Sequence, residues 1–132
     1  MNLDNFSTKD IGNLGERVGG EYLRRLGFTG ICRNIRSSFG EIDIVATSRD
    51  GACLHIIEVK TRLCMEFPGR RFEAAYDPSD NLHAHKIRRV ARLASWYVGL
   101  TDWEGEWQID GLTVWLRKRD GMARVRYYPQ LL

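Results

Sequence analysis

Hydrophobic side chains follow two different spacings along this chain of 132 residues. Three- and four-residue steps from Leu14 to Leu26 predict a helix that ends at Gly27, a residue suited to the left-handed C′ position. The same steps predict a second helix over residues 81–98, with one buried stripe. Residues 1–12 are polar, and we expect them to be loosely held.

Alternating and continuous apolar stretches predict five strands. They cover residues 29–38, 41–48, 52–61, 107–118 and 122–128. Asp50-Gly51 favours a two-residue type I′ hairpin turn between the second and third strands, and the last two strands turn at Asp120-Gly121. The resulting order, α-β-β-β-α-β-β, predicts a single α/β domain over residues 1–132, with a mixed sheet flanked by helices.

Four charged residues interrupt the otherwise apolar hairpin. A two-residue turn places Asp43 opposite Glu58 and Glu41 opposite Lys60, with all four on one face. Carboxylates paired across strands repel each other, and burial makes that repulsion more costly. A cation between Asp43 and Glu58 would relieve it, and oxygen ligands suit Mg²⁺ or Mn²⁺. The alternatives are a Lys60–Glu41 ion pair at a solvated sheet edge, or a one-residue register slip that separates the group.

Composition narrows the class of protein. The chain is 43% hydrophobic and 28% charged, which is typical of a globular domain, and it has no apolar run long enough to span a bilayer. Its three cysteines form no C-x-x-C pair, so we expect neither a disulfide framework nor a zinc site. This use of cysteine favours a cytoplasmic location. Sixteen of the 20 basic residues are arginine, which suits phosphate recognition, although a solvated surface is the simpler explanation.

Two segments of the hairpin resemble a known family. Gly40-Glu41-Ile42-Asp43, followed by Ile57-Glu58-Val59-Lys60-Thr61-Arg62, is similar to the hallmark of the YraN-like family of uncharacterised bacterial proteins. An aspartate followed by Glu-x-Lys on the next strand is also the signature of PD-(D/E)XK nucleases. Gly12-x-x-Gly15-Glu16, Asn34-x-Arg36 and Lys86 extend the resemblance over roughly residues 12–115, whereas residues 108–112 depart from the family pattern.

The resemblance implies a restriction-endonuclease-like core and metal-dependent hydrolysis of phosphodiester bonds in DNA, similar to Holliday junction resolvases. Carried over by position, Glu16, Asp43 and Glu58 would be catalytic ligands of Mg²⁺ (or Mn²⁺) and Lys60 the catalytic lysine. Glu41 would support them. Glu16 has a second interpretation, because Asn13-x-x-Glu16 also fits a helix capping box.

Basic residues near this group suggest a surface for DNA, either branched or duplex. The candidates for phosphate contacts are Arg36, Arg62, Lys86 and Arg89. A homodimer is expected if the substrate is a junction, because two strands must be cut. Two alternatives remain: a non-catalytic nucleic-acid-binding module with the same fold, and an interaction adaptor that binds through tryptophans between residues 96 and 107.

Overall fold

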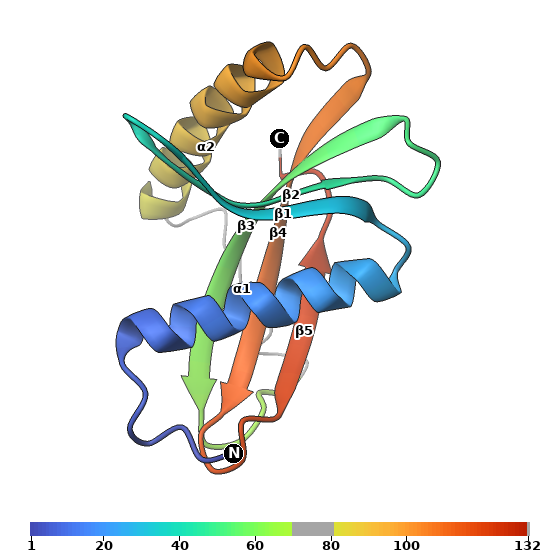
Figure 1. Cartoon of the computed structure of the whole chain (residues 1–132). Coiled ribbons are helices and arrows are strands. Elements are labelled where there is room, and N and C mark those ends of the chain that lie inside the picture. The colour runs from blue at the N-terminus through green and yellow to red at the C-terminus, as the bar shows by residue number, and fades with distance from the viewer. Residues whose placement is uncertain (70–80, 132) are drawn as a thin grey trace.

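A computed structural model describes residues 1–69 and 81–131, and the side chains of all these residues except 81–84. These residues form two helices and one sheet, whose arrangement can be followed in Figure 1. The elements are α1 (Thr8–Arg25), β1 (Thr29–Ser37), β2 (Gly40–Thr47), β3 (Cys53–Cys64), α2 (Asn81–Leu100), β4 (Glu106–Arg117) and β5 (Ala123–Tyr128). This order confirms the predicted α/β class with a mixed sheet.

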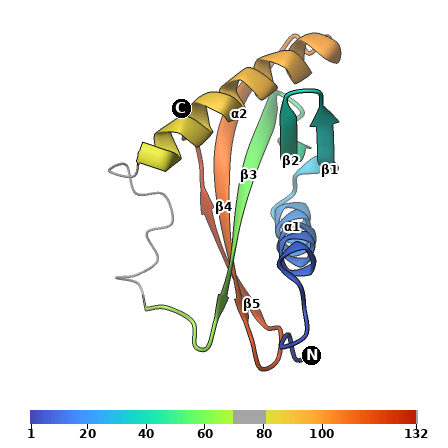
Figure 2. The same ribbon diagram turned by 90° about the vertical axis from the view of Figure 1, so that its left-hand side faces the viewer.

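The sheet has the strand order β1-β2-β3-β4-β5. All neighbours are antiparallel except β3 and β4, which run parallel because α2 connects them. Helix α1 crosses one face of the sheet and α2 packs on the other, as the two views in Figures 1 and 2 show. Within the described residues, neither helix is long and apolar enough to cross a membrane.

Helix α1 begins earlier than its apolar spacing indicated. Its N-cap is Ser7, whose hydroxyl accepts the Asp10 N–H while the Asp10 carboxylate accepts the Ser7 N–H, a complete capping box. The proposed box at Asn13 and Glu16 is therefore wrong. The segment before the helix is also anchored, because Leu3 is buried and its N–H donates to the Lys118 carbonyl.

The ends of several elements differ from the sequence prediction, and one predicted feature is confirmed. Gly27 has φ +100° and closes α1 as its C′ residue, as expected. The predicted type I′ turn is wrong: of Asp50 and Gly51, only Gly51 has positive φ, and its N–H donates to the Ser48 carbonyl. Strand β3 continues to Cys64, and part of the long connection expected after residue 61 lies outside the described residues.

The β2–β3 register is the one predicted. Ile44 pairs with Ile57 and Thr47 with Leu54, so paired numbers sum to 101 as in the expected hairpin. A four-residue connection, 49–52, gives the same register as the predicted two-residue turn. The ladder between β2 and β3 ends at the Ile44–Ile57 pair, before the charged positions are reached.

Glycines let α1 lie very close to the sheet. A Cβ at Gly15 would be 1.9 Å from Thr61 Oγ1, and a Cβ at Gly19 would be 3.0 Å from Leu112 Cδ1. Glycine in a helix interior costs roughly 1 kcal/mol relative to alanine, so these residues are explained by close packing rather than by helix propensity. The contact brings the residue that follows Gly15, Glu16, onto the sheet.

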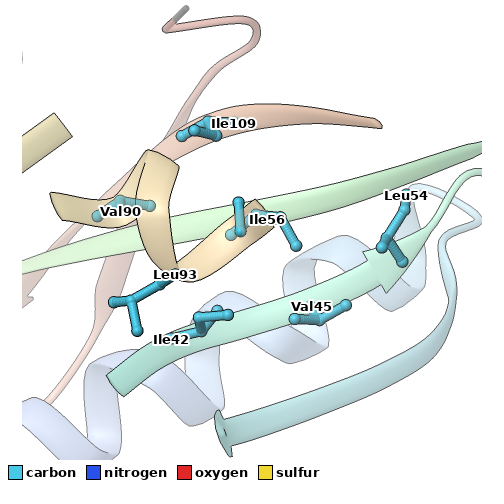
Figure 3. Packing of buried hydrophobic residues seen from close by; sticks show 8 residues of the cluster. Ile42, Val45, Leu54, Ile56, Val90, Leu93 and Ile109 are labelled. Atoms are coloured by element: carbon cyan, nitrogen blue, oxygen red, sulfur yellow. The ribbon is translucent and has the colours of Figure 1, made fainter. Parts of the chain in front are cut away.

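A compact apolar cluster holds α2 against the other face (Figure 3). Val90 and Leu93 of α2 contact side chains from β2, β3 and β4, including Ile42, Ile56 and Ile109. Such a cluster provides most of the stability of an amphipathic helix. It therefore fixes the helix surface that carries Lys86 and Arg89 relative to the sheet.

We expect Gly15→Ala to destabilise the protein by about 1–3 kcal/mol, because the new methyl group overlaps Thr61. Gly12→Ala is the matched control in the same helix. Nothing lies within 4 Å of a Cβ at Gly12, so this change should stabilise the protein by up to about 1 kcal/mol. Urea unfolding of both variants measures the difference, and equal effects would contradict the close contact.

Candidate active site: a carboxylate cluster where two strands separate

Asp43 lies at the point where β2 leaves β3. Hydrogen-bonded pairs recur every two residues in an antiparallel ladder, so the bond between Ser48 and Cys53 predicts one between Ile42 and Val59. Instead, the Val59 N–H donates to Asp43 Oδ2 at 2.8 Å. A side chain thus replaces the backbone of β2 as the partner of β3, directly between the two residues of the Glu-x-Lys motif.

The alternation of faces along β2 also changes at Asp43. Ile42 and Val45 pack in the same cluster beneath α2, whereas Ile44 packs in the cluster beneath α1. On β1, which pairs with β2, Asn34 has φ +56°, a left-handed conformation that asparagine adopts more readily than most residues. The prediction that Glu41, Asp43, Glu58 and Lys60 share one regular face is therefore corrected.

Three carboxylates meet at this point. Glu16 from α1, with Glu41 and Asp43 from β2, each offer an oxygen atom, and these atoms all lie within 4.8 Å of one another. The position of Glu16 follows from the close approach at Gly15. Glu41 was expected only in support, whereas it is one of the three residues of this cluster, which we call the carboxylate cluster.

Asn34 links two members of the carboxylate cluster. Its amide is oriented with the nitrogen toward the carboxylates, because this orientation gives both the amide oxygen and the amide nitrogen suitable hydrogen-bond partners. The nitrogen then donates to Glu41 Oε1 at 2.8 Å and to Glu16 Oε2 at 2.9 Å. Arg36 Nε lies 3.5 Å from the second oxygen of Glu41. These donors offset part of the repulsion between the two glutamates.

Burial and like charge raise the pKa of Asp43 to about 8. Desolvation is the largest cause and the charge of Glu58 the second, while the Val59 N–H opposes them. The pKa of Glu16 is also raised, first by burial, with Asp43 as a hydrogen-bonding neighbour. The carboxylate cluster thus carries more negative charge than its surroundings stabilise, which is a common feature of functional sites.

A small cavity opens from the carboxylate cluster toward α2. Its volume is about 230 Å³, and its lining includes Glu41, Asp43, Glu58, Lys86 and Arg89. Lys86 Nζ lies 2.7 Å from Glu58 Oε1, so α2 contributes a cation directly to the Glu-x-Lys motif. The cavity is therefore acidic on the sheet side and basic on the helix side.

The other predicted site residues lie along β3. Glu58, Lys60 and Arg62 project from the same face, because β3 pairs with β4 in one unbroken register from Cys53 to Cys64. Lys60 is half-buried and Arg62 is exposed. Glu58 contributes to the electrostatics of Asp43 but is not one of the three residues of the carboxylate cluster.

Sequence reasoning missed the role of Asn34, which it noted only within a family pattern. Its signal was an asparagine inside a predicted strand, where a left-handed residue interrupts regular pairing. Arg33 was also missed, although its charge partly opposes the burial that raises the pKa of Glu16.

A second buried polar group lies on the α1 side of the sheet. The Asp110 carboxylate is completely buried; it lies 2.5 Å from His55 Nδ1 and accepts hydrogen bonds from Tyr127 OH and Gln108 Nε2. The Gln130 N–H donates to it at 2.8 Å. These partners outweigh the effect of burial, and the pKa of Asp110 is lowered. We interpret this group as a structural contact that holds β3, β4 and β5 together.

The fold and the carboxylate cluster together define an α/β protein with a polar site where a mixed sheet opens. Sequence comparison gives the family. The sequence model of the "Uncharacterised protein family UPF0102" matches residues 15–124, and the chain belongs to this family. It is the same family, YraN-like, that the hairpin motifs resemble.

Relatives match most of the chain. A UPF0102 protein of Symbiobacterium thermophilum is 41% identical over 91 residues, which cover 69% of each chain. A UPF0102 protein of Mycolicibacterium vanbaalenii is 38% identical over 116 residues, 86% of each chain. A third, from Herpetosiphon aurantiacus, is 34% identical over 128 residues, which are 93% of this chain and 94% of the relative.

We expect Asp43→Asn to stabilise the metal-free protein at high pH. The folded-state pKa of about 8 lies above the usual 3.8, so the stability linked to this proton is complete below about pH 4 and is lost as the pH rises through about 8. Wild-type protein in EDTA should lose stability over that range. The variant should lose less and should be more stable at pH 8.5, by on the order of 1–3 kcal/mol in urea unfolding.

Asp120→Asn is the control for this measurement. Arg117 holds the pKa of Asp120 at about 2, so its contribution is present at neutral pH and is lost only in acid. This variant should gain nothing at pH 8.5. If the stability of Asp43→Asn falls with pH as steeply as that of the wild type, Asp43 is not the group whose pKa is raised.

Proposed function

We propose that this protein is a metal-dependent endonuclease that hydrolyses phosphodiester bonds in DNA. The observation that carries the proposal is the carboxylate cluster, whose three oxygen atoms lie within 4.8 Å beside a cavity lined by Lys86 and Arg89. Acidic groups in that arrangement attract a divalent cation, and basic groups opposite them attract a phosphate.

The chemistry of the donors fits Mg²⁺ or Mn²⁺. Glu16, Glu41 and Asp43 offer only carboxylate oxygens, the ligands that hard cations prefer. The raised pKa of Asp43 supports the fit, because a dication would relieve the repulsion that raises it. When bound, such an ion would offset the charge of the scissile phosphate and make a water molecule more acidic.

The residues of β3 have separate roles in this proposal. Glu58 adds a fourth carboxylate beside Asp43, and we assign it to the metal as well. Lys60 projects from the same face of β3 and would stabilise the negative charge that develops on the phosphate as water attacks phosphorus and the bond to the leaving strand breaks. Its half-buried position favours this role, because electrostatic interactions are stronger where water is excluded.

The basic residues around the site would hold the DNA backbone. Lys86 and Arg89 line the cavity, while Arg36 on β1 and Arg62 on β3 are exposed. Such contacts position a nucleic acid without reading its sequence. We therefore propose a substrate chosen by structure, with branched or junction DNA and duplex DNA as the candidates, and a homodimer if two strands of a junction are cut.

One contact favours a second candidate, a non-catalytic DNA-binding module. Lys86 already neutralises Glu58 at 2.7 Å, which reduces the negative charge available to a cation. If that pair persists when DNA binds, the fold would hold a phosphate without cleaving it. Cleavage and binding must therefore be measured on the same preparations.

The test uses the purified full chain with labelled four-way junction, flap, single-stranded and duplex DNA, each in Mg²⁺, Mn²⁺ or EDTA. We expect cleavage that requires the metal. Asp43→Asn and Lys60→Ala should each lower the rate by about 100-fold or more, because each removes a group that acts on the charge of the reacting phosphate.

Two controls change the same residue types elsewhere. Asp50→Asn alters a carboxylate at the β2–β3 turn, and Lys118→Ala removes a lysine at the end of β4; both should cleave like the wild type. Metal-independent cleavage, or equal rates in all four variants, would contradict the proposal. Binding without cleavage in wild type and variants alike would identify the non-catalytic module.

A further inference from the structure

A second and larger cavity lies beside the carboxylate cluster, on the side of α1. Its volume is about 560 Å³, and its walls come from the segment before α1, from α1 itself and from β1. The side chains that matter for its chemistry are Phe6, Arg17, Arg33 and Asn34. Asn34 and Arg33 also act on the carboxylate cluster, whereas Phe6 and Arg17 have no role there.

Asn34 separates this cavity from the carboxylate cluster. It lines the larger cavity, and its amide donates to Glu41 and Glu16. Glu41 in turn lines the smaller cavity toward α2. A DNA strand bound across the carboxylate cluster would therefore have the larger cavity on one side of the cluster and the smaller cavity on the other.

The larger cavity has two guanidinium groups from different elements. Arg17 comes from α1 and Arg33 from β1, and both are exposed. Asp10 also lines the cavity, and its carboxylate accepts the Ser7 N–H in the capping box, so the two arginines outnumber the single acidic group there. Two arginines at one cavity suit an anion with several oxygen atoms, such as a phosphodiester.

Phe6 adds an aromatic wall to the same cavity. Its side chain is 36% exposed, although a large apolar ring is usually buried. An exposed aromatic ring beside arginines is the combination with which proteins bind single-stranded nucleic acid, because a base stacks on the ring while cations hold the backbone.

We propose that this cavity binds one unpaired nucleotide of a DNA strand, with its base on Phe6 and its phosphate on Arg17 and Arg33. The inference rests on the proposed function, which places the neighbouring phosphate of the strand at the carboxylate cluster. A base in a duplex is paired and stacked and cannot enter a cavity without being extruded. The protein should therefore prefer DNA with a single-stranded segment next to the bond that is cut.

Binding is measured in the Asp43→Asn background with Mg²⁺, using a labelled single-stranded oligonucleotide, a flap and a blunt duplex. Phe6→Leu keeps an apolar side chain but removes the ring, and should weaken single-strand and flap binding by about 5- to 100-fold. It should leave duplex binding unchanged. Phe6→Trp keeps a stacking surface and should retain the affinity for single strands.

The arginines are tested through the dependence of affinity on salt. Arg17→Gln and Arg33→Gln should each reduce the slope of log affinity against log salt by about 0.7 on single strands, the value for one lost phosphate contact. Arg49→Gln removes the same charge at the β2–β3 turn and should not change the slope. An equal change in all three variants would show a general charge effect and would overturn the inference.

Cleavage by proteins with an intact Asp43 separates the two proposals. If the wild type cleaves and Phe6→Leu changes flap and duplex rates equally, the nucleotide site is wrong and the endonuclease stands. If the wild type cleaves nothing, yet Phe6→Leu selectively weakens single-strand binding, the nucleotide site stands and the endonuclease is wrong. Circular dichroism and thermal unfolding of each variant identify any loss of fold.

Discussion

The hydrogen bond from the Val59 N–H to the Asp43 carboxylate is the contact on which the rest of the site depends. A strand can leave its neighbour within a sheet only if the backbone groups that lose their partners find others. Asp43 provides such a partner for β3, so β2 separates there without leaving that donor unsatisfied. The separation lets Glu16 from α1 approach Asp43, and it bonds Asp43 to Val59, the residue between Glu58 and Lys60 in the motif.

The site has an energetic cost that the rest of the fold must offset. Burial and repulsion disfavour the charged form of Asp43, and the hydrogen bond from the Val59 N–H compensates only part of this. Asn34 and Arg36 act on Glu16 and Glu41 instead. The offset comes from apolar packing on both sides of the sheet, with Val90 and Leu93 on one face and α1 on the other. The buried acidic residues therefore lower the stability that this packing provides.

Much of the fold could be predicted because hydrophobic period and register are local properties. The element order and the β2–β3 register both followed from the spacing of apolar residues and the position of one turn. The grouping of Glu41 with Glu16 could not, because it depends on the left-handed backbone at Asn34, which changes the faces of two strands together. The start of α1 was missed because its first turn is polar and is signalled only by the capping residues Ser7 and Asp10.

The contact between Gly15 and Thr61 has a consequence for the evolution of the family. A Cβ at position 15 would lie 2.7 Å from the Cβ of Thr61, closer than real Cβ atoms approach each other. Only one of these two positions can therefore carry a side chain while α1 keeps its distance from β3. A side chain gained at position 15 would have to be matched by loss of the side chain at position 61. Without that loss, α1 would move away from β3 and carry Glu16 away from Asp43.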